Sequence, residues 1–262
     1  MALAAGCRSS PSAAPKPTPA INGTANGAAG AANGTDTTAN GTAAAANGTA
    51  GTDAVATKKL SKFEQAMESI VKRGGVVQFD PDDWPKAVTV VDLHGFHKAV
   101  AALDSLAPLT KLRDVNLYNS GFTDADLEHL RGLPNLLTVN LADTKITDKG
   151  LAVLSTLPNL RSLTLNETRV TDAGLQYLLG LPNLQDLSLY KTKVTDAGLA
   201  QLRNIKTLQK LVLGGSSAIT DKGMVHVVSM TQLRELTLLS TAVSKTAIED
   251  LKVASAQLRI FH

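Results

Sequence analysis

Few residues in the 262-residue sequence have the types and spacing that chemistry requires. Asp92, His94 and His97 are the nearest approach to a metal-ligand set. Zinc needs three or four ligands that converge on one point. We expect Asp92 and His94 to share one sheet face and His97 to fall in the turn beyond it. The sequence therefore predicts a solvated strand end here, and we assign no metal.

Other candidate groups are no stronger. Asp80, Asp82 and Asp83 lack the glycine and the spacing of a calcium-binding loop. No nucleophile elbow, zinc-protease helix, C-x-x-C pair or phosphate-binding loop occurs in the sequence. Thr-Asp pairs resemble catalytic carboxylates, but each stands where a helix is expected to begin, so we assign them to helix capping. We therefore expect a protein that is not an enzyme and that needs no cofactor.

Composition excludes several further classes. The formal net charge is +3 and both signs are dispersed, which is not the basic stripe of a nucleic-acid-binding protein. The only cysteine, Cys7, excludes a disulfide framework and any cysteine-rich zinc site. No apolar run reaches the length of a membrane-spanning helix. With these classes excluded, we expect the partner to be a protein or peptide, which the sequence does not identify.

Residues 1–56 differ from the rest in composition. They contain Ala and Gly tracts, four Asn-Gly-Thr triplets and only four charged residues, so they cannot bury enough apolar surface to fold. We predict a disordered, flexible tether. The triplets also fit the N-glycosylation sequon, but we interpret them as polar repeat units.

The first residues resemble a bacterial lipobox. In residues 3–7, small residues precede Cys7, which the resemblance implies to be the lipidated residue. Ala4 departs from the leucine that the pattern prefers, and six residues cannot hold a charged region plus an apolar one. Two interpretations stay open. Either the true start lies upstream and Cys7 anchors the protein in the bacterial cell envelope, or Cys7 is a thiol in a cytoplasmic tail. Contact with a membrane is expected only through this anchor.

A repeat of 24 residues dominates the remainder. The tetrapeptide Leu-Pro-Asn-Leu recurs at residues 133–136, 157–160 and 181–184. Within each unit the pattern L-x-x-[LV]-x-L-x-x-T-x-[IV]-T-D-x-G-L-x-x-L spans residues 136–154, 160–178 and 184–202. Weaker copies start at Leu112, Leu208 and Leu233, and a degenerate first copy contains Val88, Val91 and Leu93. A fixed period of this length is typical of solenoids.

This pattern resembles the leucine-rich repeats, over about residues 85–262. The T-D-x-G-L variant is similar to the cysteine-containing and GALA-like repeats, as found in planctomycete-type bacterial repeat proteins. The resemblance implies an α/β fold: a horseshoe-shaped solenoid of about seven repeats, with a parallel concave sheet and short convex helices. Residues 57–84 are expected to form an N-terminal cap of helix and strand.

Each recurring residue type has an expected role. The leucines of L-x-x-L-x-L point inward from a short strand. The first threonine of the pattern, replaced by Ser120 in one copy, is expected to form hydrogen bonds with backbone groups of the neighbouring coil. The second threonine should cap a helix, with the following Asp adding negative charge at its N-terminus. Gly150 and its equivalents should relieve crowding where helix meets strand, and the prolines should help to stop each helix.

Both ends of the array carry weaker signals. In the cap, Leu60, Phe63, Met67, Ile70 and Val71 are expected on one helical face. Ser61 and Glu64 match a capping box, two glycines follow as a stop, and residues 76–79 match a strand. Residues 258–262 start a further strand whose open edge could pair or dimerise, which leaves the oligomeric state undecided. Two extra residues around 214–217 are expected to bulge at the rim.

Outward strand positions should line up in rows across the concave face. We predict that this face recognises a protein or peptide. Tyr118 and Tyr190 are the expected anchors, because tyrosine is frequent at interface hot spots. The expected binding residues are Asp92, Asn116, Tyr118, Asn140, Thr164, Asn166, Asp186, Ser188 and Tyr190. Two alternatives stay open: a structural envelope component with no specific ligand, and an intracellular adaptor. The repeats also resemble those of F-box-type substrate receptors of ubiquitin ligases, but no F-box precedes them.

Overall fold

The computed structural model describes residues 60–80, 82, 87–95 and 103–262. The chain divides into two units, residues 1–55 and 56–262. The first unit lies outside the described residues, and so do the predicted tether, Cys7, Asp83 and His97. The following account therefore concerns the second unit.

A helix and an antiparallel strand open the described chain. Helix α1 (Lys62–Lys72) begins at a complete capping box between Ser61 and Glu64. Its inner face holds residues at helical spacing, with Ala66 and Ile70 buried and Phe63 and Met67 packed beside them. Two residues expected on this face, Leu60 and Val71, are exposed. That prediction was wrong, because Leu60 precedes the helix and Val71 lies at the edge of the inner face.

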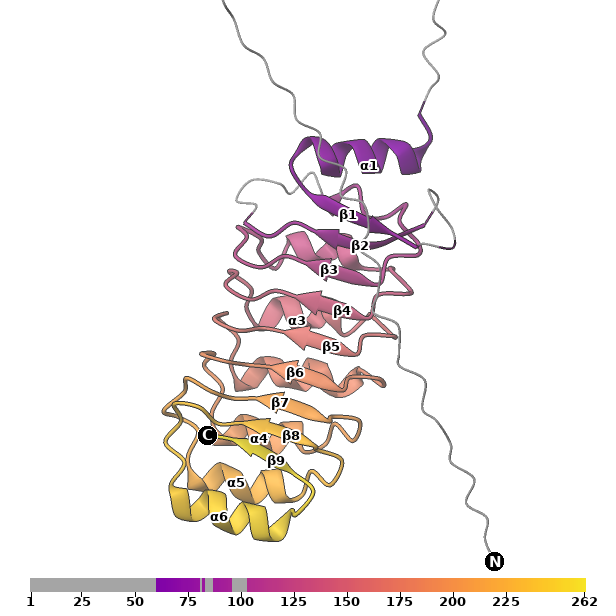
Figure 1. Cartoon of the computed structure of the whole chain (residues 1–262). Coiled ribbons are helices and arrows are strands. Elements are labelled where there is room, and N and C mark those ends of the chain that lie inside the picture. Colours follow the sequence, from indigo (N-terminus) through magenta and orange to yellow (C-terminus); the bar gives the residue numbers. More distant parts are fainter. Residues whose placement is uncertain (1–59, 81, 83–86, 96–102) are drawn as a thin grey trace, which may run out of the picture. The chain divides into compact units, whose positions relative to one another are not determined.

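In the described part of the chain the sheet contains nine strands, and their order in space is their order in the chain (Figure 1). Strand β1 is antiparallel to β2, and each later pair is parallel. The strands are β1 (Val76–Phe79), β2 (Val88–Asp92), β3 (Asp114–Asn116), β4 (Thr138–Asn140), β5 (Ser162–Thr164), β6 (Asp186–Ser188), β7 (Lys210–Val212), β8 (Glu235–Thr237) and β9 (Arg259–Phe261).

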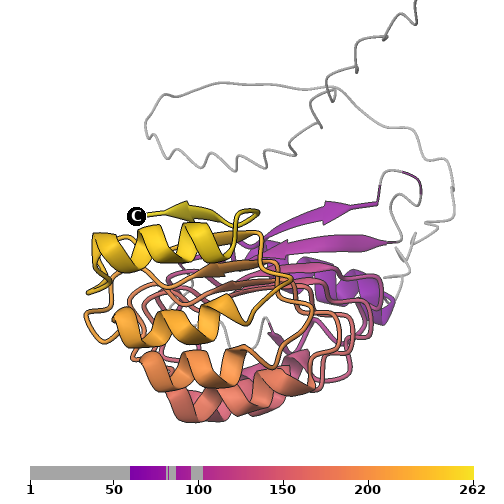
Figure 2. The same cartoon turned by 90° about the horizontal axis from the view of Figure 1, so that it is seen from below.

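Short helices return the chain between consecutive strands. In the described part they are 3₁₀ helices η1 (Asp126–Leu130) and η2 (Asp172–Gly180) and α-helices α3 (Asp148–Leu154), α4 (Asp196–Leu202), α5 (Asp221–Val228) and α6 (Lys245–Ala254). They lie on the side opposite the strands (Figure 2). This arrangement confirms the predicted leucine-rich repeat horseshoe, with its concave sheet and convex helices.

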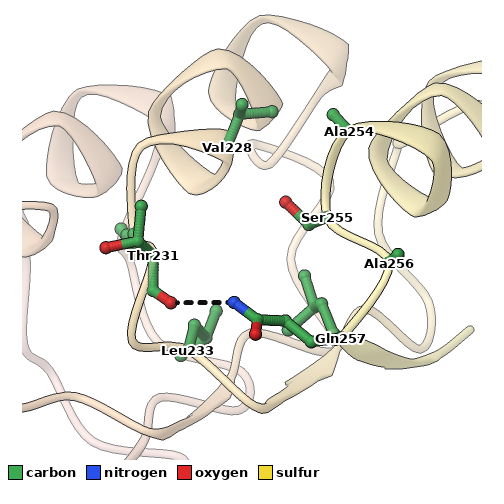
Figure 3. A pocket seen from close by; sticks show the side chains of 9 residues that line it. Val228, Thr231, Leu233, Ala254, Ser255, Ala256 and Gln257 are labelled. Atoms are coloured by element: carbon green, nitrogen blue, oxygen red, sulfur yellow. Dashed lines mark hydrogen bonds between the residues drawn. The ribbon is translucent and has the colours of Figure 1, made fainter.

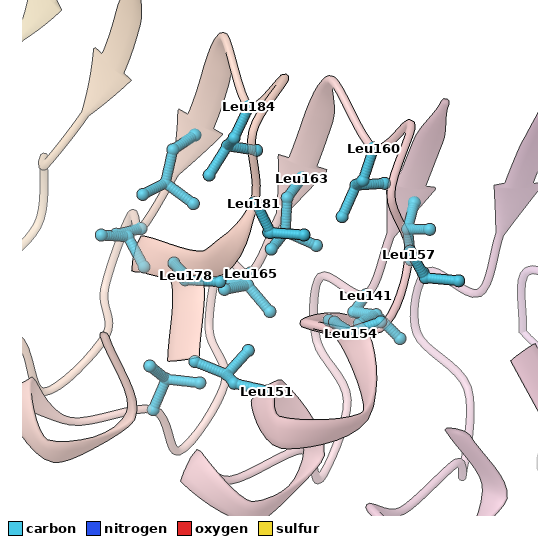
Figure 4. Close-up of a cluster of buried hydrophobic side chains, with 14 of the residues drawn as sticks. Leu141, Leu151, Leu154, Leu157, Leu160, Leu163, Leu165, Leu178, Leu181 and Leu184 are labelled. Atoms are coloured by element: carbon cyan, nitrogen blue, oxygen red, sulfur yellow. The ribbon is translucent and has the colours of Figure 1, made fainter. Parts of the chain in front are cut away.

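Leucines fill the space between the sheet and the helices along the described coils, and Figure 4 shows those of the central ones. Leu163 on β5 and Leu165 just after it are both buried, whereas Thr164 between them faces outward. Strand alternation therefore sends two leucines per coil into a continuous core. No coil buries its apolar face alone, so adjacent coils depend on one another.

The register shows where the repeat changes length. Strand partners are 24 residues apart from β2 to β7, and Lys210 on β7 then pairs with Glu235 on β8. The coil after β7 therefore contains one extra residue. Our prediction of two was wrong. The side chain of Ser216 is buried and donates to the Val194 carbonyl, while Ser217 is exposed.

The Asp of each T-D-x-G-L motif ties its coil to the next one. Asp148 accepts bonds from the backbone N–H and the hydroxyl of Thr171, at 2.8 and 2.6 Å. The same two bonds join Asp124 to Thr147, Asp172 to Thr195 and Asp196 to Thr220. Each such threonine also caps its own helix, as predicted. The Asp therefore does more than complement a helix dipole.

The glycine of the motif makes room for that Asp. A Cβ built on Gly174 would lie 2.4 Å from Asp148 Oδ1, and one on Gly198 would lie 2.4 Å from Asp172 Oδ1. We expected crowding where helix meets strand. The glycine instead faces the carboxylate of the preceding coil and a leucine beside it.

Two further sets of polar bonds hold the coils. The buried Thr144 donates its hydroxyl to the Leu141 carbonyl at 2.6 Å, and Thr168 bonds Leu165 in the same way. These bonds lie within one coil, so our prediction of a bond to the neighbouring coil was wrong. Asparagines of the Leu-Pro-Asn-Leu segments supply bonds between coils instead, such as Asn159 Nδ2 to the Pro134 carbonyl at 2.7 Å.

Candidate functional site

The outward positions of the sheet form three rows, as the sequence predicted. The first row contains Asp114, Thr138, Ser162, Asp186, Lys210, Glu235 and Arg259. The middle row contains Asp92, Asn116, Asn140, Thr164, Ser188, Val212, Thr237 and Phe261. The third row follows the strands, where backbone bonds continue the register, and contains His94, Tyr118, Ala142, Asn166, Tyr190, Gly214 and Leu239. All nine predicted binding residues therefore lie on this face, and their role in binding stays a prediction.

Amide side chains form a ladder at the N-terminal end of the middle row. Asn140 Nδ2 donates to Asn116 Oδ1 at 3.0 Å, and a further side-chain bond joins Asn116 to Asp92. Each of the three side chains also accepts the backbone N–H two residues later in the chain. These residues therefore support the turn after each strand, a structural role that the sequence did not reveal.

Asp92 forms a close pair with His94 at the start of this ladder. Its Oδ1 lies 2.9 Å from His94 Nδ1 and 3.0 Å from the His94 backbone nitrogen. Burial raises the pKa of the Asp92 carboxyl, but the hydrogen bonds from His94 outweigh it and hold the pKa below its ordinary value. The carboxylate is therefore the stable form of this group at neutral pH.

Tyr190 is held by its neighbours more firmly than Tyr118. Asn166 Oδ1 accepts the Tyr190 N–H at 2.9 Å, and its second partner is the Ser188 hydroxyl. The Tyr190 ring covers Gly214, where a Cβ would lie 2.9 Å from Tyr190 Cδ2. Tyr118 is 45% exposed. Tyr190 is partly exposed, so Tyr118 is the more exposed of the two predicted anchors.

The C-terminal half of the concave face is more apolar than the residues that we predicted from the sequence. Leu239 and Phe261 are each about half exposed, at 50% and 49%. Val212 occupies the middle row between them and Ser188, on the strand that precedes Gly214. None of these three was among the predicted binding residues. The signal was present, because Val212 interrupts a row of small polar residues.

Charged residues flank this apolar area. Glu235 bonds both Lys210 and Arg259, its neighbours in the first row. On the opposite side Lys191 Nζ lies 3.2 Å from Glu167 Oε1 and 5.2 Å from the centroid of the Tyr190 ring. A polar rim around an apolar centre is the usual arrangement of a protein-binding surface.

The described residues offer little other chemistry. No group of three or more potential metal ligands occurs among them. Asp82 donates its backbone N–H to Asp80 Oδ1, which closes a local turn. None of the described helices is both long enough and apolar enough to cross a membrane.

Comparison with known proteins finds one matching family model and a solved structure that is similar in part. Residues 132–155 match the family model described as Leucine Rich repeat. The solved structure of internalin C2 from Listeria monocytogenes is similar, with 22% sequence identity and a TM-score of 0.49, over 64% of this chain and 69% of that one. No curated protein sequence matches the chain. The matched segment is one coil of the array and contains β4 and α3.

Proposed function

We propose that this leucine-rich repeat protein is a non-enzymatic module that binds a protein or peptide on its concave sheet. The observation that carries the proposal is the exposure of large side chains on that face: Leu239 and Phe261 come from neighbouring strands at its C-terminal end, Tyr118 lies in its N-terminal half, and each is about half exposed. A sheet face adapted only to water would not place apolar side chains together. Curved solenoids also offer extended binding surfaces.

The two halves of the face suggest how a partner is recognised. The N-terminal half presents the amide ladder, whose geometry is fixed by its own hydrogen bonds. Such preorganised groups favour selectivity, because little ordering is needed on binding. The C-terminal half presents Val212, Leu239 and Phe261, which supply apolar area for affinity. An extended partner segment lying across the strands would contact both halves.

The proposal is tested by affinity capture from source cells with paired double variants. Tyr118→Ala with Leu239→Ser alters the concave face at exposed positions, so the fold should be unaffected. Tyr177→Ala with Val225→Ser makes matching changes at exposed positions on the convex helices. We expect a partner that wild type and the convex variant retain and that the concave variant binds at least about tenfold more weakly, from the loss of apolar burial.

A partner lost only from the convex variant would contradict concave binding. Capture of no partner by any form would favour the alternative of a structural component without a specific ligand. Melting curves of all three proteins provide the control for folding.

We also propose that Cys7 anchors the protein in a bacterial cell envelope, with residues 8–56 as the tether. The support is the lipobox-like order of residues 3–7 and the polar composition of the segment that follows. Wild-type protein should be recovered with membranes, because several acyl chains bind a bilayer firmly, whereas Cys7→Ala should be released. Recovery of both forms in the soluble fraction would favour the intracellular adaptor.

A further inference from the structure

One coil lacks an apolar side chain that its predecessors carry. Before most of the described strands a residue accepts the backbone N–H of the leucine three positions later, as Ile205 does for Leu208, Met230 for Leu233 and Ser255 for Leu258. In the other described coils this residue is large, apolar and buried. The residues at this position are Leu109, Leu133, Leu157, Leu181, Ile205 and Met230. Ser255 makes this bond in the last coil, whereas the strand register, in which Arg259 pairs with Glu235, places Ala254 opposite Met230. Both residues are small, so this coil lacks the large apolar side chain at either position.

An open pocket marks the missing side chain. It has a volume of about 270 Å³ and lies between the turn after α5 and the turn after α6 (Figure 3). Val228, Met230, Leu233 and Leu258 provide its apolar lining. Ser255 lines the same pocket, and Gln257 Nε2 donates to the Thr231 carbonyl across one side of it. The volume falls below the roughly 300–1,000 Å³ of small-molecule sites, so the pocket fits a side chain better than a drug-sized ligand.

The apolar surface extends beyond the pocket. Val228, at the end of α5, is 42% exposed, and Val253, near the end of α6, is 86% exposed. A partner residue inserted beside Ser255 would therefore meet apolar surface next to the pocket as well as within it. This surface is on the convex rim and is separate from the three concave rows.

The rim around the pocket is basic. Arg234 donates to Gln257 Oε1 at 3.0 Å, and Lys252 lies two residues before Ala254 of the lining. Lys206 and Arg203 belong to the preceding coil, in which they are the equivalents of Thr231 and Val228. The acids near these cations are Glu235, which bonds Lys210 and Arg259, and Glu249 and Asp250 on α6, about one helical turn before Ala254. In the described part of the chain none of the four rim cations forms an ion pair, so the rim is complementary to an acidic partner.

We infer that this pocket, here named the Ser255 slot, is a second protein-binding site. Its ligand is an acidic peptide segment that inserts one leucine, isoleucine or methionine side chain. The aliphatic side chain takes the place that the other coils fill with their own residue. Carboxylates on either side of it meet the cations of the rim. The site is independent of the proposed concave interface.

The direct probe is a fluorescently labelled peptide with a single leucine between runs of glutamate. Its binding to the full chain is measured by fluorescence anisotropy. Two matched peptides replace the leucine by glycine or the glutamates by lysine. The test variant is Ser255→Leu, which fills the slot from within. The control is Ser217→Leu, the same change at an exposed position of another coil.

We expect the leucine peptide to bind wild type and Ser217→Leu equally and to bind Ser255→Leu at least about tenfold more weakly. The glycine peptide should show a similar loss on wild type, and the lysine peptide should not bind. Since filling a cavity stabilises a fold, Ser255→Leu should melt no lower than wild type.

Several results would overturn the inference. Equal binding of the leucine peptide to Ser255→Leu, or no binding to wild type, would remove the slot as its site. A wild-type dimer that Ser255→Leu converts to monomer would assign the slot to a second copy of the chain. Methyl NMR of wild type gives an independent reading, because bound peptide must shift the signals of Val228, Met230 and Leu258, and shifts confined to other methyl groups would contradict the assignment.

Discussion

Leu163→Ala is expected to lower the free energy of unfolding by about 2–5 kcal/mol, the usual cost of deleting a buried leucine side chain. Leu163 is at the centre of the solenoid, on β5, and is almost fully buried. The coils before and after it cannot close the resulting cavity, because their own leucines are fixed by the register. Urea denaturation followed by circular dichroism measures the effect.

Its neighbour provides the control. Thr164 is on the same strand but faces outward, so Thr164→Ala should change stability by no more than about 0.5 kcal/mol. A large loss for Thr164→Ala with none for Leu163→Ala would mean that the strand is shifted by one residue.

Gly174→Ala is expected to destabilise the protein by about 1–3 kcal/mol through overpacking. The added Cβ would lie 2.4 Å from Asp148 Oδ1 and 3.0 Å from Leu151 Cδ1. Asp148→Ala should cost about as much, because it leaves the part-buried backbone N–H and hydroxyl of Thr171 without their acceptor. When the two changes are combined, the main clash is absent. The double variant should therefore be more stable than the sum of the single effects predicts, by more than about 0.5 kcal/mol.

Gly180→Ala is the matched control for this cycle. Gly180 ends the same helix, η2, and a Cβ added there would have no atom within 4 Å. Since alanine favours helix over glycine, this change should be neutral or slightly stabilising. Strict additivity of the Asp148 and Gly174 effects would show that the motif glycine does not serve the carboxylate.

The rows of the concave face followed from the sequence, because a fixed period of 24 and strand alternation together determine which side chains face outward. The partners of the repeated polar residues did not follow. Thr168 and Asp148 recur with the same period, and periodicity alone cannot tell a bond within a coil from one between coils. Only the path of the chain places Asp148 beside Thr171 and beside the space left by Gly174.

The candidate site was predictable in part for the same reason. Tyr118 stands out by residue type, and its exposure agrees with the role of an anchor. Val212 and Leu239 were not recognised as one apolar area, because they come from adjacent coils and are separated in the sequence. The Ser255 slot was invisible, since the missing side chain is recognised only when the backbone turns of successive coils are matched.

Photo-crosslinking from the centre of the concave face tests the binding function most directly. A photoreactive amino acid replaces Val212, in the middle row, and in a separate protein it replaces the exposed Val225 on convex helix α5. Both proteins are expressed in source cells and irradiated. Concave recognition predicts a discrete crosslinked partner from position 212 that is absent from position 225. A partner crosslinked from position 225 and not from 212 would contradict it.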